Sequence, residues 1–98
     1  MLHMATLSHG PETCAAVHAE YGALARSAAD SMDAIAERHG AAIKGGWVDA
    51  PGHLWFFLVD APNAHVVSNL MVELRFHSWN TLNISPVATV ADTLNQLA

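Results

Sequence analysis

The chain has 98 residues, of which 52% are hydrophobic and 13% charged, and its formal net charge is −5. A chain of this length forms one domain, residues 1–98, with a thin core, because so small a domain hides only about 60–65% of its unfolded surface. The charged share is well below the roughly 25% typical of globular domains. Only four basic residues occur, and they are scattered, which argues against nucleic acid as a partner.

The sequence also bears on cellular location. It contains no run of about 18 apolar residues, and Met1 to Met4 lack the basic start and apolar stretch of a secretion signal. The single cysteine, Cys14, excludes an internal disulfide and suits a reducing compartment. We therefore expect a cytoplasmic protein that does not enter a membrane.

The first half of the chain predicts a strand, a turn and a long helix. Leu2 to Ser8 alternate as in a strand, and Pro11 is placed to open a short helical turn. From Glu20 to His39, apolar residues recur at spacings of three and four, which predicts an amphipathic helix that Gly40 closes.

The middle of the chain predicts two strands and a helix. Ala41 to Val48 suits a strand with a bulge at Gly45-Gly46, and a turn over residues 49–52 follows. His53 to Asp60 predicts a central strand, because it is apolar on both faces. Pro62-Asn63 then starts a second amphipathic helix.

The last part predicts a strand from Ser78 to Val87 and a short C-terminal helix. Thr89 begins a capping box, and we expect the apolar residues of this helix to pack inward; they are Val90, Leu94 and Leu97. The elements then follow a ferredoxin-like β-α-β-β-α-β order, an α+β fold with a four-stranded antiparallel sheet and helices on one face. A second copy of the sheet is the simplest cover for the other face, which predicts a homodimer.

Three short segments carry a resemblance to known proteins: His39-Gly40-Ala41-Ala42-Ile43 at the end of the first helix, Asp60-Ala61-Pro62 after the third strand, and Pro86-Val87 at the end of the last. In these the chain resembles the dimeric α+β barrel superfamily, and within it the small GYD-domain proteins. Gly52-His53-Leu54-Trp55 stands where the Gly-Tyr-Asp element would be, so the roles of those polar residues do not transfer. The superfamily includes cofactor-independent monooxygenases, isomerases, haem enzymes and metal-binding proteins, so the resemblance implies a fold and no single activity.

Seven histidines make a metal site the first functional hypothesis. His9 and Cys14 lie five residues apart, and His18 follows four residues beyond, so soft and borderline ligands fall within ten residues. If Pro11 opens a continuing helix, its N-terminus favours the Cys14 thiolate, and Cys14 and His18 share a face. These residues, with His77 as a possible fourth, predict a site for nickel, zinc or copper. The alternative is that Cys14 is a small buried apolar group.

Strand alternation supports a second hypothesis, a cofactor-independent monooxygenase or isomerase for an aromatic or polyketide-like molecule. Alternation places His53 with Trp55 on one face, and His77 with Trp79 and Asn83 on a face of the last strand. Trp55 and Trp79 would stack on the ligand ring, His53 or His77 would move a proton, and Asn80 or Asn83 would steady an oxyanion. A third hypothesis is a non-catalytic assembly module whose aromatic residues fill a dimer core.

Overall fold

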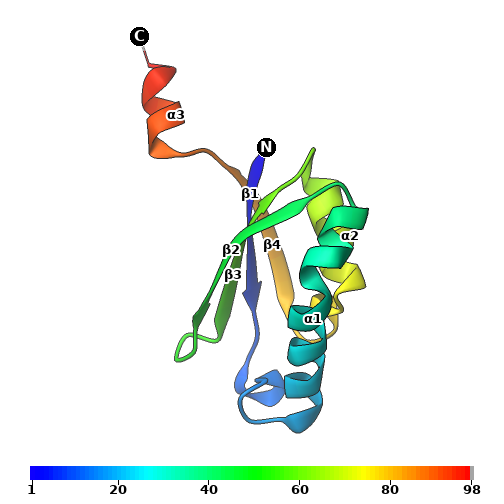
Figure 1. The fold of residues 1–98 in the computed structure, drawn as a ribbon. Coiled ribbons are helices and arrows are strands. Elements are labelled where there is room, and N and C mark those ends of the chain that lie inside the picture. Colours follow the sequence, from blue (N-terminus) through cyan, green and yellow to red (C-terminus); the bar gives the residue numbers. More distant parts are fainter. Residues whose placement is uncertain (98) are drawn as a thin grey trace.

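The computed structural model describes residues 1–97 as one layer of sheet and one layer of helices (Figure 1). The sheet is antiparallel, with its strands in the order β2-β3-β1-β4. The strands are β1 (Leu2–Ser8), β2 (Ala42–Asp49), β3 (Leu54–Asp60) and β4 (Thr81–Val87). Helices α1 (Ala19–Arg38) and α2 (Ala64–Glu73) lie on one face. The predicted α+β class, the four-stranded antiparallel sheet and the order of the long elements are confirmed.

Local sequence explains where the two long helices begin and end. α1 ends before Gly40, which has a φ of 70°, a left-handed conformation that glycine adopts without a steric penalty. α2 begins after Asn63, whose Oδ1 accepts a 3.0 Å hydrogen bond from the Val66 N–H. In the described part of the chain no helix is both long and apolar enough to cross a bilayer.

The core lies between the sheet and the two helices. Alternate residues of β1 are buried, from His3 to Leu7, and Phe57 and Val59 of β3 face the same way. α2 contributes Val67, Leu70 and Met71 to the core. Burial of each such large apolar side chain stabilises the fold by about 1.5–3 kcal/mol.

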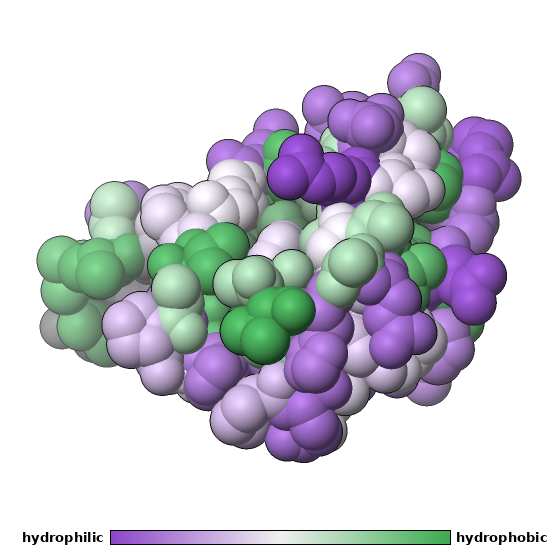
Figure 2. Space-filling model, turned by 90° about the horizontal axis from the view of Figure 1, so that it is seen from below, coloured by the Kyte–Doolittle hydropathy of each residue, from purple (hydrophilic) through white to green (hydrophobic). Residues whose placement is uncertain are grey.

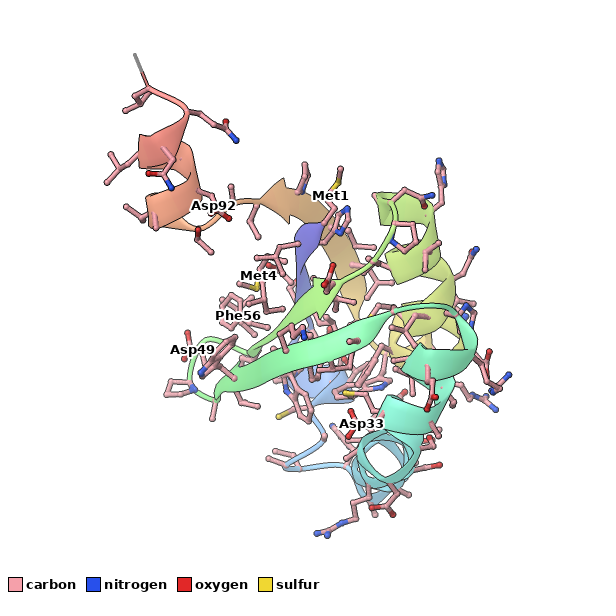
Figure 3. All side chains as sticks on the ribbon, turned by 45° about the horizontal axis from the view of Figure 1, so that its top comes forward. Met1, Met4, Asp33, Asp49, Phe56 and Asp92 are labelled. Carbon is pink, nitrogen blue, oxygen red and sulfur yellow. The ribbon has the colours of Figure 1, made fainter. Side chains whose placement is uncertain are left out.

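The opposite face of the sheet carries apolar side chains that no other element of residues 1–97 covers. Leu54, Phe56 and Leu58 of β3 are half-buried there, next to Met4 of β1. Figure 3 shows Met4 and Phe56 on the side of the sheet away from α1 and α2. The prediction that β3 is apolar on both faces is confirmed, and this second face is called the open face below.

The start of the last strand was predicted wrongly. β4 begins at Thr81, three residues after the predicted Ser78, because Phe76–Ser78 form a short 3₁₀ helix, η2. Arg75, with a φ of 66°, ends α2 and turns the chain, and the Trp79 and Asn80 N–H groups both donate to the Phe76 carbonyl. Strand alternation therefore does not apply to residues 76–80.

The β2–β3 hairpin contains a bulge, as expected, but the C-terminal helix differs from expectation. The register of β2 with β3 shifts between Ile43 and Gly45, so a bulge is present in β2, but it lies at Lys44, just before the predicted Gly45-Gly46. Helix α3 (Val90–Asn95) is capped by Thr89 Oγ1, which accepts from the Asp92 N–H at 3.0 Å. It projects from the end of β4 away from the helix layer (Figure 1), and its apolar residues do not pack inward: the exposed fractions are 75% for Val90, 60% for Leu94 and 66% for Leu97.

Candidate metal centre

Three potential metal ligands converge at one end of the sheet. His9 follows β1, Cys14 follows the short 3₁₀ helix η1 (Pro11–Thr13), and His53 precedes β3. One ligand atom from each lies within 4.8 Å of the ligand atoms of the other two. We call this set the His9–Cys14–His53 cluster. Figure 2 views the molecule from the end that carries these loops, where hydrophobic residues lie among hydrophilic ones.

Sheet register brings the two histidines together. Ser8 pairs with Leu54 at the end of the β1–β3 ladder, so the next residues outward, His9 and His53, stand opposite each other. The His9 N–H donates to the His53 carbonyl at 3.2 Å, and the ring centroids are 5.2 Å apart. The cluster is therefore an extension of the antiparallel ladder, and its spacing depends on that ladder.

The loop that carries Cys14 is held by hydrogen bonds. In η1 the Cys14 N–H donates to the Pro11 carbonyl at 3.4 Å, and the Thr13 hydroxyl donates to the Trp79 carbonyl at 3.1 Å. Pro11 does open a helical turn, but it ends at Thr13, and Cys14 is at its C-terminal end. The predicted contribution of a helix N-terminus to the thiolate is therefore wrong. The side chain of Cys14 is only 9% exposed.

A chain of hydrogen bonds sets the tautomer of His9. The Asn80 Nδ2 amide donates to the Phe76 carbonyl at 3.2 Å, which leaves Asn80 Oδ1 to face His9 Nδ1 at 2.9 Å. An amide oxygen only accepts, so His9 Nδ1 must carry the proton. Its Nε2 then keeps a lone pair available to a metal, which is the usual arrangement of a histidine ligand held by a neighbouring group.

His53 has a buried ring nitrogen with no hydrogen-bond partner. Within residues 1–97, its Nδ1 is one of three buried side-chain nitrogen or oxygen atoms without a partner. Leaving such a group unpaired costs about 1–3 kcal/mol. The backbone of His53 is also unusual, with a φ of 55°, and its N–H donates to the Ala50 carbonyl at 3.2 Å. The turn thus holds the ring at the cluster but does not satisfy its nitrogen.

Aromatic rings surround the cluster on its inner side. The ring centroid of Trp79 lies 5.3 Å from that of His9 and 5.6 Å from that of Trp55. The planes of the two tryptophan rings meet edge-on at 87°. Trp79 is only 3% exposed. Apolar surroundings of this kind strengthen the interaction of an ion with its ligands.

The separations suit a small transition-metal ion. In a tetrahedral zinc site, Zn–N distances near 2.0 Å and a Zn–S distance near 2.3 Å place ligand atoms about 3.3–3.5 Å apart. Contraction from separations of up to 4.8 Å requires side-chain movements of about 1 Å. Three protein ligands also leave one position of a tetrahedron free.

The structure does not bring all the predicted ligands together. His18 precedes α1, and its Nε2 lies 3.1 Å from the Pro11 carbonyl, outside the cluster. The helix does not continue from Pro11 to His18, so Cys14 and His18 do not share a helical face. His77 is exposed in η2 and is also outside the cluster.

The residues of the enzyme hypothesis are brought together only in part, because His77 is exposed and Asn83 lies away from the others. Trp55 and Trp79 do meet. Trp79, however, precedes β4 and is buried in the core, so it does not lie on the strand face predicted from alternation. Asn83 pairs with Thr6 and is exposed on the open face, opposite the side that Trp55 faces. Asn80 contacts His9, so it belongs to the surroundings of the metal cluster.

The carboxyl group of Glu73, in the helix layer and away from the cluster, has a lowered pKa. Glu73 on α2 accepts from Arg38 and lies 2.8 Å from His39 Nε2, at the end of α1. The hydrogen bond from His39 and then that from Arg38 hold the pKa of the Glu73 carboxyl below its ordinary value of 4.5. This pair of contacts links the C-terminal ends of the two helices.

Comparison with known proteins assigns no family to this arrangement. No protein-family model matches the chain, and no curated protein matches it. Its function is therefore argued from the geometry of the His9–Cys14–His53 cluster.

Proposed function

We propose that the protein binds one transition-metal ion through His9, Cys14 and His53. His9 contributes Nε2 and Cys14 its thiolate, and His53 contributes Nδ1, the nitrogen that lacks a hydrogen-bond partner among the described residues. The observation that carries the proposal is the convergence of these ligands from three separate segments within 4.8 Å. An ion there would also give the buried His53 nitrogen a partner.

Ligand chemistry supports nickel, zinc or copper as the metal. Imidazole suits zinc, copper and nickel, and a thiolate adds preference for the softer ions, whereas calcium and magnesium take oxygen ligands. Among divalent ions copper binds such a set most tightly. The structural alternative, a cysteine that only fills space, explains the burial of Cys14 but neither the fixed tautomer of His9 nor the unpaired His53 nitrogen.

A cobalt titration tests the proposal directly. Cobalt(II) replaces zinc in such sites, and a thiolate ligand produces a charge-transfer band in the near ultraviolet. We expect one equivalent of cobalt to develop this band in the purified protein, and zinc or copper(II) to displace it. Cys14→Ser should remove the band, and His53→Ala should weaken cobalt binding by about 100-fold, since each loses one ligand.

His18→Gln is the matched control, because it changes a histidine of the same loop whose ring contacts the Pro11 carbonyl outside the cluster. Its cobalt affinity should remain within about twofold of the original. A protein that develops no thiolate band, or whose affinity falls only in His18→Gln, would contradict the proposed site.

We further propose that the open face packs against the same face of a second copy, as in a dimeric α+β barrel. Large half-buried side chains lie on this face, among them Phe56 and Leu58, and α3 presents a second apolar surface. A two-fold interface uses the same patch on both chains, so one apolar face can cover another. A sheet face with this many apolar groups left in water would favour aggregation.

A further inference from the structure

The His9–Cys14–His53 cluster forms part of the lining of a small cavity. The cavity has a volume of about 90 Å³ and lies between the Cys14 loop and the β2–β3 turn. The side chains that line it beside the cluster are Ala15, Ala16, Val48, Asp49, Ala50 and Trp55. Apart from Asp49 this lining is apolar.

Asp49 does not complete the ligand set. Among residues 1–97 it is not part of the cluster of converging ligand atoms, and its Oδ1 accepts a 3.0 Å hydrogen bond from the Gly52 N–H in the turn. Three protein ligands leave a fourth position on the proposed metal, and the cavity that the cluster borders would be the space for a ligand there. Sites of this kind take water or an external ligand at the open position.

Charge and size define that ligand. A divalent ion bound to one thiolate and two neutral imidazoles keeps one net positive charge, which favours an anion at the open position. The carboxylate of Asp49 in the lining is exposed to solvent and accepts from the Gly52 N–H, so it does not take that position. An apolar cavity of about 150 Å³ holds benzene. At about 90 Å³, this one has room for a ligand of only two or three heavy atoms beside the ion.

We propose that the metal centre binds a small monoanion of two or three heavy atoms at its open position, with the cavity rejecting larger anions. The inference rests on the proposed metal site and adds the chemical class of its ligand. The anion would displace a metal-bound water and form the fourth bond to the ion, and the Trp55 and Val48 side chains would limit its length.

Azide is the probe, added to the cobalt-loaded protein, with benzoate as the larger anion. We expect azide to shift the visible cobalt bands in a saturable way and benzoate to leave them unchanged. Two variants fill the cavity from different sides, Ala16→Leu in the loop and Val48→Phe on β2; both positions are exposed as well as lining the cavity. Each should keep the thiolate band and bind azide about tenfold or more weakly.

Ala23→Leu, at an exposed position on α1 that does not line the cavity, is the control and should bind azide unchanged. A cobalt protein with its thiolate band that ignores excess azide would overturn this inference but leave the metal site standing. Equal azide affinity in Ala16→Leu, Val48→Phe and the original protein, or saturable binding of benzoate, would overturn it too. Failure of cobalt to bind at all would remove both proposals together.

Discussion

Asn80 and His9 are 71 residues apart in the chain, yet Asn80 Oδ1 and His9 Nδ1 lie 2.9 Å apart, and this contact places a proton of His9 on Nδ1. The orientation of the amide is not arbitrary, because its Nδ2 donates to the Phe76 carbonyl. In the proposed metal site Asn80 would be a positioning residue, which acts on the ion through His9 without touching it.

Replacement of Asn80 by leucine should weaken metal binding without abolishing it. The variant keeps all three ligands but lets His9 rotate and change tautomer, and loss of such a supporting contact lowers affinity by about 10–100-fold. Competition titration with a chromophoric chelator measures the change. Asn83→Leu, on the open face, is the control for metal binding and should keep the original affinity. Equal affinities in the two variants would refute the positioning role.

Metal affinity should fall as the pH falls. In the proposed site a thiolate and neutral imidazoles would bind the ion, so protons would compete for each ligand, and the apparent affinity should fall about tenfold per pH unit for every proton that binding displaces. Cobalt titrations at a series of pH values, each monitored by the thiolate band, measure this slope. An affinity independent of pH under acidic conditions would mean that these side chains are not the ligands.

A charge on the open face should separate the proposed dimer. Phe56→Asp places a carboxylate at the interface, where a buried unpaired charge is strongly unfavourable, and should weaken association by about tenfold or more. Light scattering coupled to size-exclusion chromatography measures the mass. Val72→Asp is the matched control, because Val72 is 45% exposed on α2, on the helix layer, and its variant should remain dimeric. A monomeric original protein, or a dimeric Phe56→Asp variant, would count against the interface.

The Glu73 contacts should contribute to stability at neutral pH and lose that contribution in acid. The pKa of Glu73 is lowered in the folded protein, so its charged form stabilises the fold above the ordinary pKa of 4.5, and the effect disappears as the pH falls through the lowered value. Glu73→Gln should therefore have a slightly lower melting temperature at pH 7, because the group is solvent-exposed and screened. In thermal melts the two proteins should converge once the pH lies below the lowered pKa of Glu73. A difference that grows in acid would have the wrong sign.

Alternation and caps predicted most of the fold because each depends on neighbouring residues alone. β1 has the predicted bounds, Gly40 and Asn63 mark helix ends as expected, and a bulge is present in β2 just before Gly45. Residues 76–80 were misassigned because an alternating pattern carries no mark of where a strand begins. There the burial of Phe76 and Trp79 in one core required a 3₁₀ turn.

The site was predicted only in part. His9 and Cys14, two of the predicted ligands that are close in sequence, do converge, whereas His53 was assigned to a different hypothetical site and His18 lies outside the cluster. Hydrophobic pattern determines which face a residue takes but not the offset between two strands. The observed register pairs Ser8 of β1 with Leu54 of β3, and this pairing is what brings His9 next to His53. The sequence pattern does not contain that register.

The left-handed backbone of His53 destabilises the fold slightly, while its side chain provides a ligand of the proposed metal site. Histidine tolerates a φ of 55° better than most residues, but glycine adopts it without a steric penalty, so His53→Gly should relieve the backbone while it deletes the site. A population of variants selected only for resistance to heat would be expected to discard this histidine early. One selected for metal retention would keep it. Position 53 would thus report which of the two pressures had acted on a variant.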